Sequence, residues 1–122
     1  MGERNIKKTN VRLIQLIEDL KRYSREHEAS IWKEVGRRLE SPSKNHSEVN
    51  LSRINRYTKL SDVIVVPGKV LGAGVLDHPV TVAAVNFTDS ARKKIIATGG
   101  TVITIEELLR TLSERSNVKI IR

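Results

Sequence analysis

The sequence predicts a single mixed α/β domain in which helices occupy the first half and strands dominate the second. The 122 residues are enough for one domain with a modest core but too few for two ordinary domains. Apolar residues recur at helical spacing up to residue 39, whereas β-branched residues cluster from residue 63 onwards. The second half then reads strand, strand, helix, strand, helix, strand, an order typical of mixed α/β domains. We divide the chain into a basic arm (1–9), a basic helical region and linker (10–60) and an α/β core (61–122).

The arm is polar and predicted to be flexible, and it carries Arg4, Lys7 and Lys8. Asn10 is a residue type that caps helices, so we expect a first helix to follow it. The apolar side of this helix is formed by Leu13, Leu16, Ile17 and Leu20, with Val11 and Ile14 alongside.

A second, shorter helix is expected after Ser30, which we interpret as its N-cap. One face of this helix is apolar and consists of Ile31, Trp32, Val35 and Leu39. Trp32 is the single tryptophan, and its expected role is that of a core anchor rather than a platform for stacking a base. Pro42 ends any helix there, so residues 40–48 predict a polar loop.

The next segment alternates Val49 and Leu51 with polar neighbours, which predicts a short half-buried strand or an extended segment. Beyond it, Arg53, Arg56 and Lys59 follow one another three residues apart. This spacing places the three cations near one face if the segment is helical.

The α/β core begins with residues 63–66, which are all β-branched and predict a buried strand that Pro67 and Gly68 stop. Residues 69–74 predict a loop, and residues 80–85 predict a second strand, after which Phe87 follows.

Capping residues mark the helices of this core. Thr88 is expected to cap a helix over residues 89–98 that Gly99 and Gly100 close. Thr104 and Glu107 have the spacing of a capping box before a last helix. The apolar residues expected in the remaining elements are Val102 and Ile103 in a brief strand, Leu108, Leu109 and Leu112 in the last helix, and Val118, Ile120 and Ile121 in a last strand.

The charge of the chain favours a polyanionic partner, and nucleic acid leads that class. The net charge is +8 and the pI is near 10.1. Residues 1–60 contribute +6 and residues 61–122 contribute +2, so the first half is the better candidate for a phosphate-facing surface. The alternative is an ordinary basic surface that water solvates.

Several function classes are excluded by composition. The chain has no cysteine, which excludes disulfides, thiolate metal sites and cysteine nucleophiles and fits a reducing compartment. No apolar run approaches the roughly 20 residues of a membrane span, and the first residues lack the apolar stretch of a secretory signal. We therefore expect a cytoplasmic protein without a membrane partner.

Residues 66–74 form a glycine-rich segment after a strand. The segment is not a Walker A motif, because Lys69 follows its first glycine and Gly74 is followed by Val and Leu. It is not a dinucleotide fingerprint either, because Asp77 stands where the third glycine belongs. Either its glycines let backbone N–H groups approach an RNA phosphate, with Lys69 adding a charged contact, or it is a plain turn between strands.

No residue pattern indicates catalysis or a metal site. His27, His46 and His78 are not at metal-ligand spacing, and contact of His46 or His78 with phosphate or ribose competes with an ordinary surface or turn role. No Ser/His/Asp order or nucleophile elbow is present, and the acidic pairs 18–19 and 106–107 lack the surroundings of an acid/base site. We expect no enzymatic activity, no cofactor and no small-molecule substrate.

Two further patterns concern the mode of recognition. Residues 92–94 (Arg-Lys-Lys) lie on the expected helix after Thr88, and there a solvated face competes with a phosphate contact. The four aromatic residues, which do not interleave with basic residues as in single-strand binders, are Tyr23, Trp32, Tyr57 and Phe87. This pattern favours recognition of folded RNA through its backbone and shape.

Two stretches carry a resemblance to a known family. The first comprises residues 39–42 and 48–54, and the second comprises residues 65–72 followed by 76–78. Together with the segments 80–84 and 116–121, they resemble the archaeal and eukaryotic large-subunit ribosomal protein called eighteen-e, a relative of bacterial ribosomal protein fifteen. The resemblance covers nearly the whole chain.

This resemblance implies a compact α/β fold of irregular β-β-α turns preceded by helices. It also implies contact with large-subunit ribosomal RNA and with neighbouring ribosomal proteins, without catalytic activity. The motif residues that carry over are Asn50, Ser52 and Arg53, then Pro67, Gly68, Lys69 and Gly72. The chain departs from the family pattern at 99–103, which is more apolar, and at 110–115, and both departures concern local contacts.

We therefore expect a structural, RNA-binding constituent of the large ribosomal subunit, in which Lys and Arg neutralise phosphates where RNA helices approach one another. The residues expected to contact RNA are Lys7, Lys8, Arg12, Arg37, Arg38, Lys44, Arg53, Arg56, Lys59 and Lys69. One rival is a general nucleic-acid binder outside the ribosome, which would bind unrelated duplexes equally well. A second is a small phosphate-using enzyme built on the glycine segment, which a nucleotide would stabilise against heat.

Overall fold

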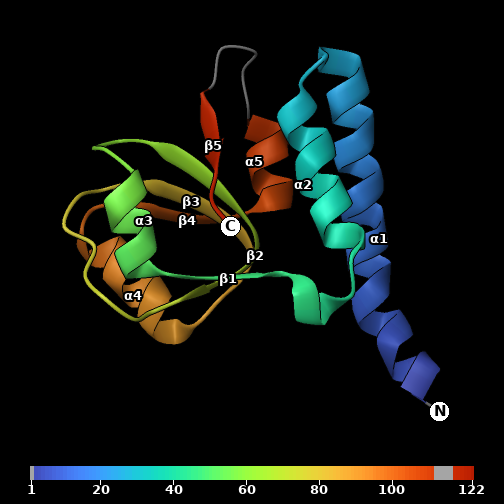
Figure 1. Ribbon diagram of the computed structural model, residues 1–122, viewed down its shortest axis with the longest axis horizontal. Helices are drawn as coiled ribbons and strands as arrows, with labels where there is room; N and C mark the ends of the chain where they lie inside the picture. The colour runs from blue at the N-terminus through green and yellow to red at the C-terminus, as the bar shows by residue number, and fades with distance from the viewer. Residues whose placement is uncertain (1, 112–116) are drawn as a thin grey trace.

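The computed structural model describes residues 2–111 and 117–122, with side chains from residue 11 onwards. The elements in chain order are α1 (Gly2–His27), α2 (Ser30–Glu40), the 3-10 turn η1 (Ser43–Asn45), β1 (Ser47–Asn50), α3 (Leu51–Tyr57), β2 (Val63–Leu71), β3 (Thr81–Phe87), α4 (Asp89–Ala97), β4 (Thr101–Thr104), α5 (Ile105–Thr111) and β5 (Val118–Ile120). Figure 1 shows α1, α2 and α5 on one side of the sheet and α3 and α4 on the other. The expected mixed α/β domain that begins with helices is confirmed.

Strand β2 is the centre of a sheet whose described pairings are all parallel. One edge of β2 pairs with β3, and β3 in turn pairs with β4. The other edge of β2 is divided between two short strands. The first part, Val63–Val65, pairs with β5, and the last part, Gly68–Leu71, pairs with β1.

Alternation along β2 divides the core between the two faces of the sheet. Ile64 and Val66 belong to a cluster with apolar residues of α3 and α4, whereas Val65 belongs to a cluster with residues of α1, α2 and α5. Successive side chains of a strand point to opposite faces, so one β-branched run serves both clusters. Trp32 is 3% exposed and lies in the second cluster, which confirms its expected role as a core anchor.

The expected starts of the first two helices are wrong. Helix α1 begins at Gly2, well before Asn10, because the intervening residues include good helix formers such as Arg4 and Lys7 and contain no Pro or Gly. Ser30 is the first residue of α2 rather than its cap. The N-cap position belongs to Ala29, whose extended backbone makes no side-chain cap bond.

The expected end of the strand at Pro67 and Gly68 is also wrong, because β2 continues to Leu71. The pairing register with β3 shifts between Val66 and Lys69, so this stretch is a β-bulge where the missing N–H of Pro67 is tolerated. Gly68 lies against β1 so closely that a Cβ there would be 2.0 Å from the Ser47 carbonyl oxygen. Lys69 therefore lies on a strand and not in a loop.

The expected helix caps in the second half are confirmed. The Thr88 side chain accepts a hydrogen bond from the Ala91 N–H at 3.2 Å, and Gly99 has the positive φ of +87° that suits glycine at a helix end. Thr104 and Glu107 exchange the reciprocal bonds of a capping box, each 3.1 Å long. Leu112, expected in α5, lies outside the described residues.

Among the helices of the described residues, none combines the length and the apolar surface that a membrane crossing needs.

Replacement of glycine by alanine should have different effects at Gly68, in the bulge of β2, and at Gly36, in α2. Gly68→Ala should lower the free energy of unfolding by about 2 kcal/mol or more, because the new methyl group collides with the backbone of β1. Gly36→Ala, within α2, should be neutral or stabilising by up to about 1 kcal/mol, because its Cβ would lie 3.5 Å from the Leu20 Cβ, an ordinary contact. Urea denaturation of both variants measures the difference, and equal losses would contradict the packing described for Gly68.

Candidate nucleic-acid interface

The positive charge of the first half is unevenly shared between its structural parts. Residues 11–40, which form most of α1 and all of α2, carry seven Lys/Arg against six Asp/Glu, a net charge of +1. Residues 41–60, which include η1, β1 and α3, carry four Lys/Arg against one Glu, a net charge of +3. Residues 2–10, at the start of α1, add a further +2, so residues 2–40 and residues 41–60 each carry +3. The positive charge is therefore about twice as dense along the chain on and around α3 as on the long helices.

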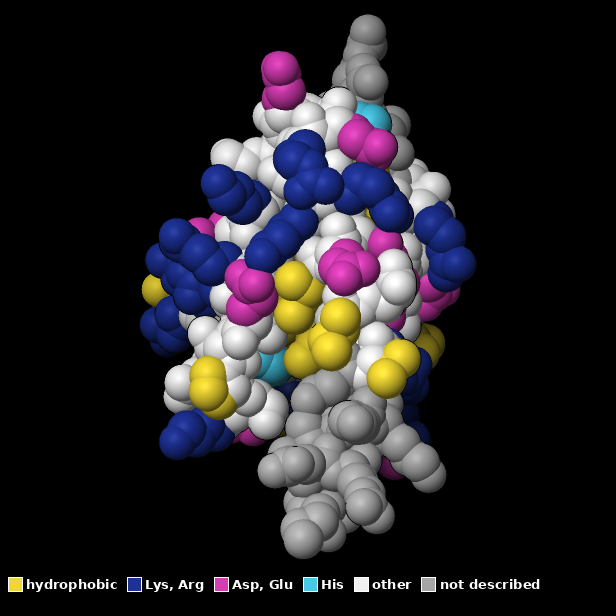
Figure 2. All heavy atoms as spheres, turned by 90° about the vertical axis from the view of Figure 1, so that its right-hand side faces the viewer, with side chains coloured by type: hydrophobic (Ala, Val, Ile, Leu, Met, Phe, Trp, Pro, Cys, Tyr) yellow, Lys and Arg dark blue, Asp and Glu magenta, His cyan; other side chains and the backbone are white. Residues whose placement is uncertain are grey.

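Ion pairs within the chain hold many of the cations of α1 and α2. Figure 2 shows this side of the molecule, where Lys and Arg side chains stand among Asp and Glu. Lys21 pairs with Glu40 at 2.6 Å. Two of the expected RNA-binding residues, Arg37 and Arg38, each lie 2.9 Å from a carboxylate oxygen of Glu34. Such pairs reduce the charge that these residues offer to an external phosphate.

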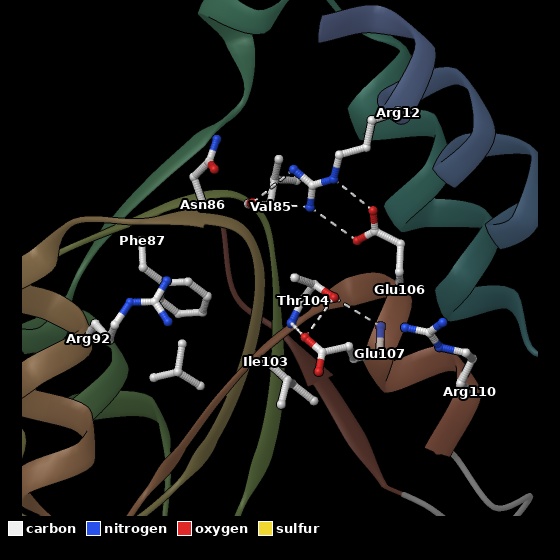
Figure 3. Close-up of a pocket in the computed structure, with 11 residues that line it drawn as sticks. Arg12, Val85, Asn86, Phe87, Arg92, Ile103, Thr104, Glu106, Glu107 and Arg110 are labelled. Carbon is white, nitrogen blue, oxygen red and sulfur yellow. Dashed lines mark hydrogen bonds and ion pairs between the residues drawn. The ribbon is translucent and has the colours of Figure 1, made fainter.

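Arg12 is also held by the protein itself. Figure 3 shows its guanidinium reaching from α1 to Glu106 at the start of α5 and to the end of β3. The Nε donates to Glu106 Oε2 at 2.8 Å and a terminal nitrogen donates to Oε1 at 3.2 Å, while the Val85 carbonyl accepts longer contacts of 3.4 and 3.5 Å. Arg12 thus links three elements, and its fork is directed inward.

The contacts of Arg12 favour the charged form of the Glu106 carboxyl group. Partial burial raises the pKa of Glu106, but the hydrogen bond from Arg12 and the nearby positive charges of Arg12 and Arg110 outweigh it. The pKa of Glu106 therefore lies below its ordinary value, and the carboxylate stays charged opposite the guanidinium.

Five expected RNA-binding residues remain exposed, and within the described residues the structure shows no ion pair for any of them: Lys44, Arg53, Arg56, Lys59 and Lys69. They come from η1, α3, the turn after α3, and β2. Because α3 ends at Tyr57, Lys59 does not share a helix with the other two cations of its series. The side chains of Lys7 and Lys8 lie outside the described part of the chain.

Lys69 has two polar neighbours on adjacent strands. Its partner in register is Glu48 on β1, and on the other side it is Asn86 on β3. All three residues are exposed, and paired residues of a parallel sheet point to the same face. Lys69 therefore lies in a mixed polar row near an acidic neighbour.

The glycine-rich segment is packed tightly against the protein's own backbone. A Cβ on Gly72 would lie 2.9 Å from the Ala91 nitrogen at the start of α4, and a Cβ on Gly74 would lie 2.8 Å from the Ser52 nitrogen. The Lys94 ammonium donates to the Gly72 and Gly74 carbonyls at 2.7 and 3.1 Å. The close approach that the glycines permit is thus used inside the molecule, and Lys94 fastens the segment to α4.

The described contacts of two histidines lie within the chain. The His46 Nε2 lies 3.2 and 2.9 Å from the Leu39 and Ser41 carbonyls at the end of α2, and His78 lies between the Thr58 hydroxyl and the Asp77 carboxylate. The hydrogen bond from His78 lowers the pKa of Asp77. Within the described residues, no group of three or more His, Cys, Asp or Glu side chains is placed to hold a metal ion.

Two basic residues that sequence reasoning missed lie beside α3. Lys119 on β5 and Arg122 just after it line the same groove as Arg53. Their distance in sequence from α3 hides this proximity, because only the pairing of β5 with β2 brings them there. The alternation of residues 118–121 predicts a strand but not its neighbour in the sheet.

Comparison with known proteins gives a consistent result over the whole chain. A family model described as ribosomal protein 60S L18 and 50S L18e matches residues 1–122. A protein named large ribosomal subunit protein eL18 from Methanoregula boonei is 53% identical over 98% of each chain. Proteins of the same name from Methanosphaerula palustris (50% identical, 96% of this chain and 97% of the relative) and Haloarcula marismortui (48% identical, 94% and 98%) are also similar. These findings confirm the resemblance that the motifs indicated.

The inward fork of Arg12 predicts a pH-dependent loss of stability. Because the pKa of Glu106 is lower in the folded than in the unfolded chain, its contribution is complete above the ordinary value of 4.5 and is lost as the pH falls below it. Arg12→Ala should therefore lower the free energy of unfolding by about 1 kcal/mol near pH 7. The difference from the unchanged protein should shrink towards about pH 3.

Urea denaturation over this pH range measures the effect, and Arg22→Ala is the matched control. Arg22 pairs with Asp19 on the surface of α1, with 57% of its side chain exposed, so its loss should matter less. A loss for Arg12→Ala that is independent of pH would contradict the role assigned to Glu106.

Proposed function

Because the chain belongs to the family of the ribosomal proteins 60S L18 and 50S L18e, we propose that it is a structural constituent of the large ribosomal subunit, where it binds and stabilises folded ribosomal RNA. The family is one of ribosomal proteins and not of enzymes, in keeping with the absence of catalytic motifs from the sequence. The partners proposed for it are large-subunit ribosomal RNA and neighbouring ribosomal proteins.

The division of the cations supports binding through backbone phosphates. Arg12, Arg37 and Arg38 are occupied by carboxylates of the chain, whereas Arg53 and Arg56 present exposed guanidinium groups on α3. A phosphate that meets an unpaired cation gains a charge-assisted hydrogen bond and releases counterions without first breaking an internal pair. The residues proposed to contact phosphate are Lys44, Arg53, Arg56, Lys59 and Lys69, with Lys69 moderated by Glu48.

The structure of α3 suits this task. Leu51 and Ile54 are fully buried and fasten the helix to the sheet, so Arg53 and Arg56 on its outer side extend from a fixed base. The Thr58 hydroxyl donates to the Ile54 carbonyl at 2.6 Å and meets His78 at 2.7 Å, which stabilises the end of the helix. Cations on a rigid helix lose less freedom on binding than cations on a flexible loop.

Combined replacement of unpaired cations tests the proposal. The triple variant Arg53→Ala, Arg56→Ala, Lys69→Ala should weaken binding to purified large-subunit ribosomal RNA by at least about tenfold. It should also flatten the dependence of log K on log salt by about 2 to 3, because each lost phosphate contact removes nearly one unit of slope. Filter binding at several salt concentrations measures both quantities.

The control removes three cations that the chain itself neutralises: Lys21→Ala, Arg22→Ala, Arg37→Ala. The net charge falls equally, but affinity and slope should change less. Unchanged affinity and slope in the first triple variant would refute the assignment to α3 and β2. Equal losses in both would show that overall charge, and not these contacts, governs binding.

A further inference from the structure

A groove of about 700 Å³ crosses the edge of the sheet at β5. One wall is α3, from which Arg53 and Tyr57 line the groove, and β5 with the residues after it forms the opposite side. Ile31 at the start of α2 also lines the groove. In the described pairings β5 joins β2 alone, so its other edge has no strand partner among the described residues.

The charge of this groove has one sign. Its lining includes Arg53, Lys119 and Arg122 and contains no Asp or Glu among the described residues. Lys119 pairs with Asp62 at 3.0 Å but keeps half of its side chain exposed. Asp62 itself accepts a hydrogen bond from the Lys59 N–H and is mostly turned away from solvent. Because the pair with Asp62 reduces the charge that Lys119 offers, an anionic occupant meets positive charge chiefly from Arg53 on α3 and from Arg122 after β5.

The groove also presents an aromatic ring. Tyr57 is 53% exposed, whereas Trp32 is buried and Phe87 packs against the core. The Arg53 guanidinium lies over the Tyr57 ring, with its Cζ 5.6 Å from the ring centroid. Because about half of Tyr57 remains exposed despite this cation, a base can stack on the ring while a nearby cation neutralises its phosphate.

We propose that this groove binds an unpaired nucleotide of the ribosomal RNA, with the base against Tyr57 and the phosphate near Arg122. The proposal rests on the proposed function and adds a contact with a base to the phosphate contacts named there. The open edge of β5 supplies donors and acceptors for the base edge. An extended peptide added to β5 is the competing occupant, but it would use neither the ring of Tyr57 nor the positive walls as fully.

The first test uses short RNA probes in solution. Titration of the isotope-labelled protein with a single-stranded adenosine hexamer, followed by NMR, should shift signals of α3 and β5. Tyr57→Ala should raise the Kd for this probe about tenfold, whereas Tyr57→Phe, which keeps the ring, should stay within about twofold. Binding of a fully paired RNA duplex should be the same for all three proteins.

Matched controls keep the result interpretable. Ile96→Ala removes another exposed apolar side chain, on α4, and should leave hexamer binding unchanged. Thermal unfolding of each variant verifies its fold, and Arg122→Gln should reduce the salt slope for the hexamer by about 0.7 if Arg122 contacts a phosphate. Hexamer binding that is equal in Tyr57→Ala and in the unchanged protein would overturn the proposal.

The second test identifies the occupant in the assembled subunit. Replacement of Tyr57 by the photoreactive p-benzoylphenylalanine should give a cross-link to ribosomal RNA at an unpaired nucleotide after irradiation of large subunits. A cross-link to a protein instead would overturn the proposal in favour of the peptide. Failure of the unchanged chain to bind ribosomal RNA or to enter large subunits would refute the proposed function itself, whereas normal binding without this cross-link would refute only the groove.

Discussion

The coverage of β2 on both faces and both edges is the constraint on which the rest of the structure depends. Ile64 and Val66 face one helical layer and Val65 faces the other, so neither layer can shift without exposing a buried β-branched side chain. The edge opposite β3 is shared by β5 and β1, and the bulge at Pro67 and Gly68 separates the two pairings. The positions of α3, of the glycine segment and of residues 118–122 all follow from this arrangement.

The two halves of the basic surface carry out different physical tasks. On α1 and α2, four cations have carboxylate partners within the chain: Arg12, Lys21, Arg22 and Arg37. The pairs of Arg12 and Lys21 join two helices, whereas those of Arg22 and Arg37 lie within one helix. Around α3, Arg53 and Arg56 have no such partner among the described residues. The net charge of +8 therefore describes neither region well. On α1 and α2 less charge is available to RNA than the total suggests, and around α3 the available charge is more concentrated.

Phosphate contacts and a stacking contact have complementary effects in RNA binding. Exposed cations on a rigid helix provide affinity that depends on salt and tolerates many sequences. A single aromatic ring beside them distinguishes an unpaired nucleotide from a duplex, because only an unstacked base exposes its face. Tyr57, the one aromatic residue of the described part of the chain that is more than half exposed, lies next to Arg53, so the proposed interface would combine both effects within one groove.

Local sequence signals determined much of the fold and part of the interface. The β-branched run at 63–66, the Thr88 cap and the box of Thr104 with Glu107 are decided by neighbours in sequence, and each was predictable. The sequence pattern left open whether the segment that carries Arg53 and Arg56 is helical, and the structure shows it to be the helix α3, with Leu51 inside it rather than in a strand. The starts of α1 and α2 were not predictable, because capping residues mark permitted helix ends without requiring them.

Only the tertiary structure decided which cations are paired with carboxylates of the chain and which residues distant in sequence lie close together. Arg12 and Glu106 are 94 residues apart, and Arg53 lines the same groove as Arg122 only because β5 pairs with the start of β2. The continuation of β2 past Pro67 likewise required β1 on its edge, since a proline with glycine ends a strand unless a bulge and a close partner accommodate it. Composition and local pattern therefore determined that the protein is a basic α/β domain. The pairing of distant strands decided where its charge is free, because that pairing depends on packing between segments that no local pattern connects.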